Sequence, residues 1–190
     1  MNPVAALIGA IKALAGRHDW TEHFDLRKTG LQQSFVALIL TIPAFYLIAH
    51  AVQLERAKVL EEAVNAVPLA PFAIILLLYL LCFSATSYIF TMIFDKQDRF
   101  RPWVITRHWS VFWLVLIVAG VFGLNLIGVM PFAIANYIAL AAFLCILLID
   151  IRLAQTIIPF PMGAAILIGC TINAMGLVVV LLGFEQVVGA

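Results

Sequence analysis

Side chains that could carry out chemistry are few in this chain, and they stand among long apolar stretches. Asp150 is the best single candidate for a functional carboxylate. Arg152 follows two residues later, a spacing at which two side chains do not face each other on a helix. We therefore expect both to mark the end of a helix at a membrane interface, with a catalytic acid at Asp150 as the alternative.

Hydroxyl groups form a second candidate set. Ser84, Ser87 and Thr91 recur at three- and four-residue spacing, so a helix would place them along one side. One interpretation is a polar path or a contact to a substrate. The other is hydrogen bonding between helices and to the helix's own carbonyl groups, which the spacing favours.

Three carboxamides, Asn125, Asn136 and Asn173, are the most polar groups inside the apolar stretches. A carboxamide in hydrocarbon needs hydrogen-bond partners, so each should face another helix. Asn125 and Asn136 lie on either side of a short connection and could meet. Amides without a carboxylate inside the same stretches give little basis for ion coupling, so a structural role is predicted.

Other chemistry has little support in the sequence. His18, Asp19, His23 and Asp25 could be imagined as metal ligands, but the spacing of the two histidines matches no helix face. Motifs for phosphate binding, zinc hydrolysis or a serine nucleophile are missing. We expect no metal, no cofactor and no enzymatic activity. Three single cysteines are read as small apolar residues: Cys82, Cys145 and Cys170.

The apolar stretches themselves predict the fold. The chain is 65% hydrophobic with a mean hydropathy of +1.11, and about 20 apolar residues of helix cross a bilayer. Five charge-free stretches of that order predict an all-α integral membrane protein, a single domain over residues 1–190 with an interfacial segment over 1–30. The predicted spans are 31–52, 69–94, 109–129, 132–149 and 163–184.

Local signals add detail to these spans. Val4, Leu7, Ile8, Ile11 and Leu14 recur at helical spacing and predict a short amphipathic helix on the membrane surface or docked on the bundle. The polar residue at position 12 interrupts the run, so we expect no cleaved signal peptide.

Prolines and one charged stretch predict how the helices end. Pro43 should kink the first span, and the sequence over residues 54–62 should extend its helix before Pro68. Residues 128–132 predict a tight helical hairpin with Pro131 in the first turn of the next helix. Pro159 and Pro161 should stop the fourth helix shortly after Asp150.

Basic residues predict the orientation. With five spans, nine lysines and arginines fall on one side and two, Arg56 and Lys58, on the other. Cytoplasmic loops carry the excess, so the N-terminus is expected in the cytoplasm and the C-terminus outside the cell membrane. Four basic residues of the second connection could also contact anionic lipid headgroups: Lys96, Arg99, Arg101 and Arg107.

Small residues give a packing pattern, because they let helix backbones approach closely in a membrane. They are spaced for one helix face and could pack within the chain or against a second copy: Ala119 and Gly123 in the third span, and Ala165, Gly169, Asn173 and Gly176 in the fifth.

The segment Phe24–Gly30, Phe-Asp-Leu-Arg-Lys-Thr-Gly, leads into Ser34 and Phe35, and Trp109-Ser110 opens the third span. In these features the chain resembles small bacterial inner-membrane proteins. Five spans with a cytoplasmic N-terminus resemble the layout of the Yip family of membrane proteins. The resemblance implies a fold and no activity.

Together these patterns predict a non-enzymatic inner-membrane protein, an accessory, assembly or membrane-organising component that acts through helix–helix or lipid contacts. Its partners would be the lipid bilayer and another membrane protein or a second copy of itself, and not nucleic acid. The alternative is a small oligomeric transporter or channel. Convergence of the hydroxyls and amides on one water-filled cavity would favour transport, and their dispersion would favour the accessory role.

Overall fold

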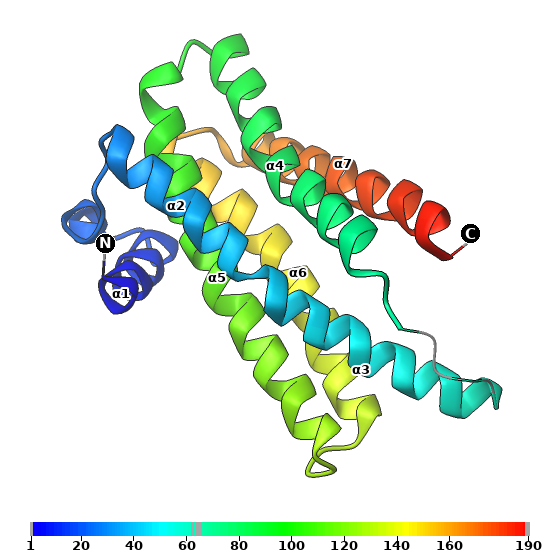
Figure 1. Ribbon diagram of the computed structural model, residues 1–190. Coiled ribbons are helices and arrows are strands. Elements are labelled where there is room, and N and C mark those ends of the chain that lie inside the picture. Colours follow the sequence, from blue (N-terminus) through cyan, green and yellow to red (C-terminus); the bar gives the residue numbers. More distant parts are fainter. Residues whose placement is uncertain (1, 62, 64–65, 189–190) are drawn as a thin grey trace.

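The protein is a bundle of long helices, as the sequence predicts. The computed structural model describes residues 2–61, 63 and 66–188, with the backbone alone for residues 184–188. In Figure 1 the long helices run side by side, and a short N-terminal helix lies against one flank. The elements are α1 (Pro3–Leu14), the 3-10 helix η1 (His18–His23), α2 (Lys28–Leu40), α3 (Ile42–Leu60), α4 (Leu69–Ile93), α5 (Gln97–Leu126), α6 (Phe132–Ile157) and α7 (Met162–Val188).

Five stretches of the described residues are long and apolar enough to cross a membrane, which confirms the predicted all-α class and the number of candidate spans. The first combines α2 and α3. The bounds are Lys28–Leu60, Leu69–Ile93, Gln97–Leu126, Phe132–Ile157 and Met162–Gly183.

The first stretch is interrupted where Pro43 predicts a kink. α2 ends at Leu40 and α3 begins at Ile42, because proline has no N–H to continue the hydrogen-bond ladder. Thr41 lies between the two helices, and its hydroxyl donates a hydrogen bond to the carbonyl of Leu38 at 2.6 Å. α3 then continues past the predicted span but ends at Leu60, before Pro68; Glu62 lies outside the described residues.

Two helices extend farther than predicted. α5 begins at Gln97 rather than near residue 109. α6 runs farther past Asp150 than expected, to Ile157, and stops before Pro159, as the prolines predict. A span predicted from hydropathy ends where charged residues begin. The backbone hydrogen bonds of a helix can continue through charged residues, so Arg107 and Asp150 lie well inside their helices. The tight hairpin is confirmed: α5 ends at Leu126, and Pro131 directly precedes α6.

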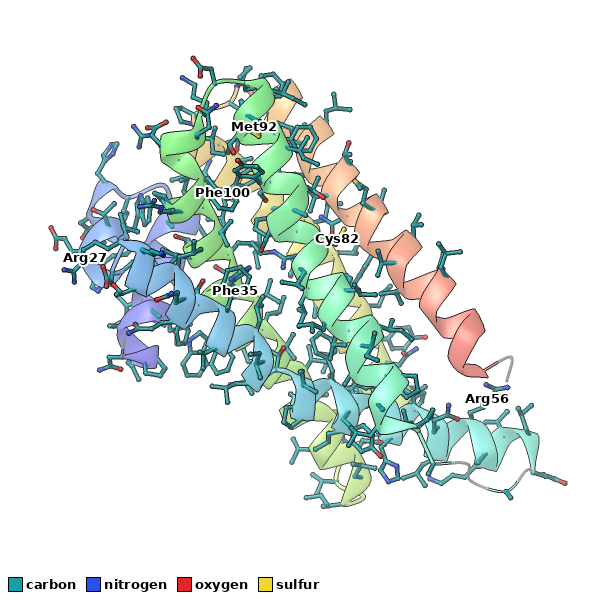
Figure 2. The ribbon with its side chains drawn as sticks, turned by 45° about the horizontal axis from the view of Figure 1, so that its top comes forward. Arg27, Phe35, Arg56, Cys82, Met92 and Phe100 are labelled. Atoms are coloured by element: carbon teal, nitrogen blue, oxygen red, sulfur yellow. The ribbon has the colours of Figure 1, made fainter. Side chains whose placement is uncertain are left out.

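The two ends of the bundle differ in their packing. We call the end that carries the α4–α5 connection, with Lys96, Arg99 and Arg101, the basic end, and the opposite end, with Arg56, the far end. Figure 2 places Met92 and Phe100 at the basic end, away from Arg56. The largest apolar cluster fills the basic end around Trp103, whereas the far end holds smaller, separate clusters.

α1 docks on the bundle through its small residues. Ala6, Ala10 and Ala13 are buried in the cluster of the basic end, and α1 contacts both α5 and α6. The indole N–H of Trp113 donates to the carbonyl of Pro3 at 3.2 Å, and Arg152 donates to the carbonyl of Leu14 at 2.9 Å. Of its larger apolar side chains, Leu14 packs against the same cluster, whereas three are exposed: Val4, Ile8 and Ile11.

Gly30, near the start of α2, should tolerate substitution much less well than Gly120 in α5. A Cβ atom at Gly30 would collide with the carbonyl oxygen of Asp25, whereas one at Gly120 would meet nothing within 4 Å. Gly30→Ala should therefore lower the free energy of unfolding by about 1–3 kcal/mol. Gly120→Ala should be neutral or stabilise by up to about 1 kcal/mol, because alanine favours a helix. Thermal unfolding in detergent measures both, and equal midpoints would contradict the predicted contact.

Candidate functional site

A buried ion pair joins α5 to α6. Arg107 Nε donates to Asp150 Oδ1 at 3.1 Å, and the two side chains are 4% and 0% exposed. Removing two charges from water is costly and is offset only when geometry and further hydrogen bonds satisfy them. Asp150 is therefore a buried carboxylate within a long apolar helix, and its charged partner is Arg107 rather than Arg152.

Two neighbours complete the surroundings of this pair. The side-chain amide of Asn173 on α7 donates to Asp150 Oδ2 at 3.0 Å. The guanidinium carbon of Arg107 lies 4.3 Å from the centre of the Phe83 ring on α4, a cation–π contact of about 0.5–2 kcal/mol. One guanidinium nitrogen, Nη1 of Arg107, has no hydrogen-bond partner among the described residues. The pair thus connects four helices but is not fully satisfied.

A buried histidine of α5 lies beside the ion pair and links α2 to α4. His108 is fully buried, and its ring nitrogens lie 3.0 Å from the Ser34 hydroxyl and 3.1 Å from the Ser84 hydroxyl. Ser34 donates its hydrogen to the carbonyl of Leu31, so it can only accept from Nδ1–H of His108. Nε2 is then free to accept from Ser84, and a neutral imidazole satisfies the whole chain of bonds.

These groups lie at one level of the bundle, which we call the polar layer. Its members are Ser34, Ser84, Arg107, His108, Asp150 and Asn173. Sequence analysis singled out Ser84, Asp150 and Asn173 but missed Ser34 and His108. His108 and Arg107 were assigned to a connection because they follow other basic residues. The apolar run Trp103-Val104-Ile105, fully buried in the structure, was the signal that the helix had already begun.

The remaining polar candidates do not join this layer. Ser87 is buried, and its hydroxyl has no partner among the described residues, while Thr91 donates to its own helix at the carbonyl of Tyr88. Asn125 donates to the carbonyl of Met130 and so closes the hairpin. Asn136, which was expected to face another helix and could have met Asn125, is instead exposed. The hydroxyls and amides are therefore dispersed.

The small-residue pattern of α7 packs within the chain. Ala165 is fully buried, and a Cβ at Gly169 would lie 2.6 Å from the Ile151 side chain of α6. A Cβ at Gly176 would lie 2.9 Å from the ring of Tyr79 on α4. In α5, Ala119 packs in the small apolar cluster with Ala44 of α3, whereas Gly123 faces open space.

The predicted headgroup residues separate into two groups. Lys96, Arg99 and Arg101 are exposed at the basic end, and Arg99 pairs with Asp98 at 3.0 Å. Lipid contact by these three stays a prediction. Arg107 does not have the exposed position that such a contact requires, because its charge is committed to Asp150 inside the bundle.

Two acidic residues that precede α2 form hydrogen bonds and ion pairs with their neighbours. Asp25 accepts hydrogen bonds from Arg27 at 2.8 Å and from the Thr29 hydroxyl at 2.6 Å. These bonds, that to Arg27 first, hold the pKa of Asp25 well below its usual range. Lys12 at 2.7 Å likewise lowers the pKa of Asp19. Both carboxylates thus have cationic partners. Groups of three or more potential metal ligands do not occur among the described residues.

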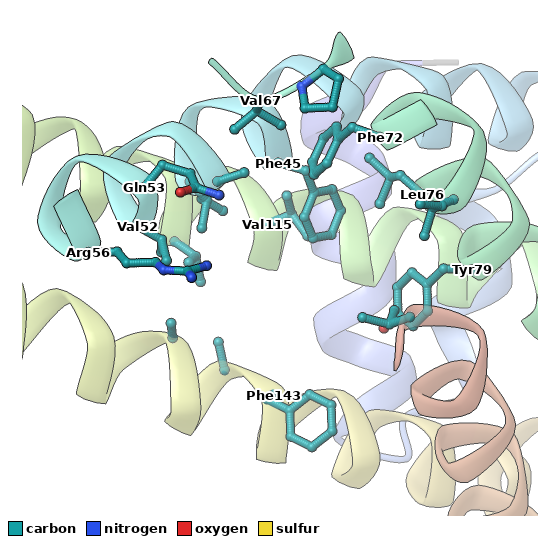
Figure 3. A pocket seen from close by; sticks show the side chains of 18 of the residues that line it. Phe45, Val52, Gln53, Arg56, Val67, Phe72, Leu76, Tyr79, Val115 and Phe143 are labelled. Carbon is teal, nitrogen blue, oxygen red and sulfur yellow. The ribbon is translucent and has the colours of Figure 1, made fainter. Parts of the chain in front are cut away.

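An apolar cavity of about 800 Å³ opens beside the polar layer, toward the far end. Side chains from α3, α4, α5, α6 and α7 line it, and Val52, Phe143 and Leu177 on its wall are exposed, so the cavity is open to the outside. Figure 3 shows Gln53 and Arg56 extending from α3 at one end, with Tyr79 at the other. The volume falls in the range of known small-molecule sites, about 300–1,000 Å³.

Tyr79 connects the cavity to the polar layer. Its side chain lines the cavity, and on α4 it precedes Ser84 of the polar layer by five residues. The arrangement is therefore an apolar site with one polar group at its inner end and two at its mouth. Of the residues predicted from the sequence to do chemistry, none lines it.

The ion pair yields a prediction for stability. Asp150→Ala leaves the Arg107 charge buried without its partner and should cost about 3–5 kcal/mol of unfolding free energy. The double variant Arg107→Met, Asp150→Leu removes both charges and should recover most of that loss. Arg152→Ala is the control, because Arg152 is exposed and loses only its hydrogen bond to the Leu14 carbonyl, which should cost about 0.5–1.5 kcal/mol. Thermal unfolding that gave Asp150→Ala and Arg152→Ala the same midpoint would refute the pairing.

Comparisons with protein-family models, with curated proteins and with solved structures find no match to this chain. The resemblance to the Yip family and to small bacterial inner-membrane proteins stays a prediction from the sequence. The function has to be inferred from the side chains of the chain itself.

Proposed function

We propose that this chain is a non-enzymatic membrane protein that binds a lipid in the cavity between its helices. The protein would span the bacterial inner membrane five times, with the basic end in the cytoplasm and the far end outside. The lysines and arginines at the basic end support this orientation, since cytoplasmic segments carry the basic excess. The sequence predicts an accessory protein that acts through helix–helix or lipid contacts, and lipid binding is the second of these two possibilities.

The observation that carries the proposal is the apolar cavity. The cavity holds about 800 Å³ and is open to the outside, so molecules of the surrounding medium can enter it. Between Tyr79 at one end and Gln53 and Arg56 at the other, its walls are aliphatic and aromatic. A bound water needs two to four polar partners, which this middle part does not supply, so hydrocarbon is the expected filling.

The depth of the cavity supports the same conclusion. Asp150 lies 18 residues along α6 from Phe132, or about 27 Å at 1.5 Å per residue. This nearly equals the thickness of a bilayer's hydrocarbon core, about 30 Å. With the far end at one surface, the polar layer would lie near the other surface, and the cavity would lie in the hydrocarbon between them. An acyl chain is the molecule available there.

A small transporter or channel is the alternative from the sequence. The hydroxyls and amides that would form a polar path are dispersed and do not line the cavity. The described side chains therefore favour binding over transport.

Blocking the cavity tests the proposal. Leu177 lines it, whereas Leu182, on the same helix and also exposed, does not. Leu177→Trp should fill part of the space and lower the number of lipids retained after purification in mild detergent by about one per chain. Leu182→Trp should leave that number unchanged. Native mass spectrometry counts the lipids, and thermal unfolding checks that both variants fold. Equal lipid content in the two variants would contradict the proposal.

A further inference from the structure

Arg56 is the cationic side chain at the mouth of the cavity. It projects from α3 into the opening, at the end opposite Tyr79 (Figure 3). Within the described parts of the chain its guanidinium has no ion pair and no hydrogen bond. The neighbouring acid, Glu55, is engaged by Lys58 at 3.3 Å. Among the described residues, a guanidinium without a partner thus faces an apolar site, with five N–H donors suited to a phosphate or carboxylate.

The rest of the wall gives the cavity an amphipathic form. Between its ends the lining is made of aliphatic and aromatic side chains, with Ile48, Leu76 and Val118 as examples. Gln53 stands one helical turn before Arg56 and adds an amide to the mouth. Among the described lining residues the one charged side chain, Arg56, thus lies at the end where a headgroup would lie, and the middle of the cavity suits an acyl chain.

The position of Arg56 along the bundle fits a headgroup. Arg56 and Phe132, the first residue of α6, line the same small surface depression, so Arg56 lies at the level where α6 begins. Taken with the length of α6 up to Asp150, this is the level expected for the bilayer surface at the far end. A lipid whose tail lies among Leu76 and Val118 would bring its phosphate to this level.

We infer that the cavity selects a membrane phospholipid with an anionic headgroup, held by the guanidinium of Arg56. This inference rests on the proposed lipid-binding function and adds the class of lipid. Arginine binds phosphate oxygens through two parallel charge-assisted hydrogen bonds. The Gln53 amide is placed to donate to a headgroup oxygen. Selection comes from charge at the mouth, and retention comes from the apolar wall.

The test uses the full chain in mixed micelles that contain equal amounts of phosphatidylglycerol and phosphatidylcholine with identical acyl chains. Native mass spectrometry counts which lipid stays bound. The unaltered protein should retain phosphatidylglycerol preferentially. Arg56→Gln should lower the preference about fivefold, the ratio expected from the attraction of one basic side chain to anionic lipid, and should still retain one lipid per chain.

Lys58→Gln is the matched control. Lys58 has the same charge and lies two residues away, but it does not line the cavity, so its loss should leave the preference intact. A preference that survives Arg56→Gln, or that falls equally with Lys58→Gln, would overturn the inference. Retention of both lipids without preference by the unaltered protein would also overturn it and would leave the lipid-binding function standing. Retention of neither would refute the lipid-binding function itself.

Discussion

The ion pair between Arg107 and Asp150 is the interaction on which the arrangement of the bundle depends. Neither charge is exposed enough to be solvated, so each requires the other. Asn173 and Phe83 complete the contacts of the pair, so α4, α6 and α7 must meet α5 at one level. Apolar packing alone tolerates sliding between helices, because one aliphatic contact can replace another. A buried ion pair forms its hydrogen bonds at only one relative position of the helices, so it prevents such sliding.

The same layer explains why the two ends of the bundle differ. Around Trp103 and Phe83 the aromatic rings pack edge to face at 5.5 Å between their centres, and the basic end is filled. Toward the far end the apolar clusters are smaller and separate, and the walls carry small residues such as Ala49 and Ala139. Small side chains leave space between the helices, and that space is the cavity.

Much of this fold could be predicted from the sequence, because hydrocarbon imposes a simple pattern. The five apolar stretches, the break at Pro43, the hairpin before Phe132 and the N-terminal helix all follow from local chemistry. The polar layer did not follow. Arg107 and Asp150 are 43 residues apart, and each adjoins other polar residues. Arg107 was therefore interpreted as part of a connection and Asp150 as the end of a helix. Which distant charges pair depends on how the helices are arranged, and local patterns do not carry that information.

The cavity was hidden for a related reason. Its lining residues are mostly apolar side chains of five helices. In the sequence, an apolar residue that lines a cavity cannot be distinguished from one in a packed core. The single unusual member is Arg56, interpreted beforehand as a minority basic residue of a connection. Its significance comes from position, because Arg56 lines one end of the cavity and Tyr79 the other (Figure 3). The wall between them is apolar and is open at the exposed side chains of Val52, Phe143 and Leu177. Such a space offers an ion no continuous set of polar partners, which supports the proposed binding of a lipid over conduction.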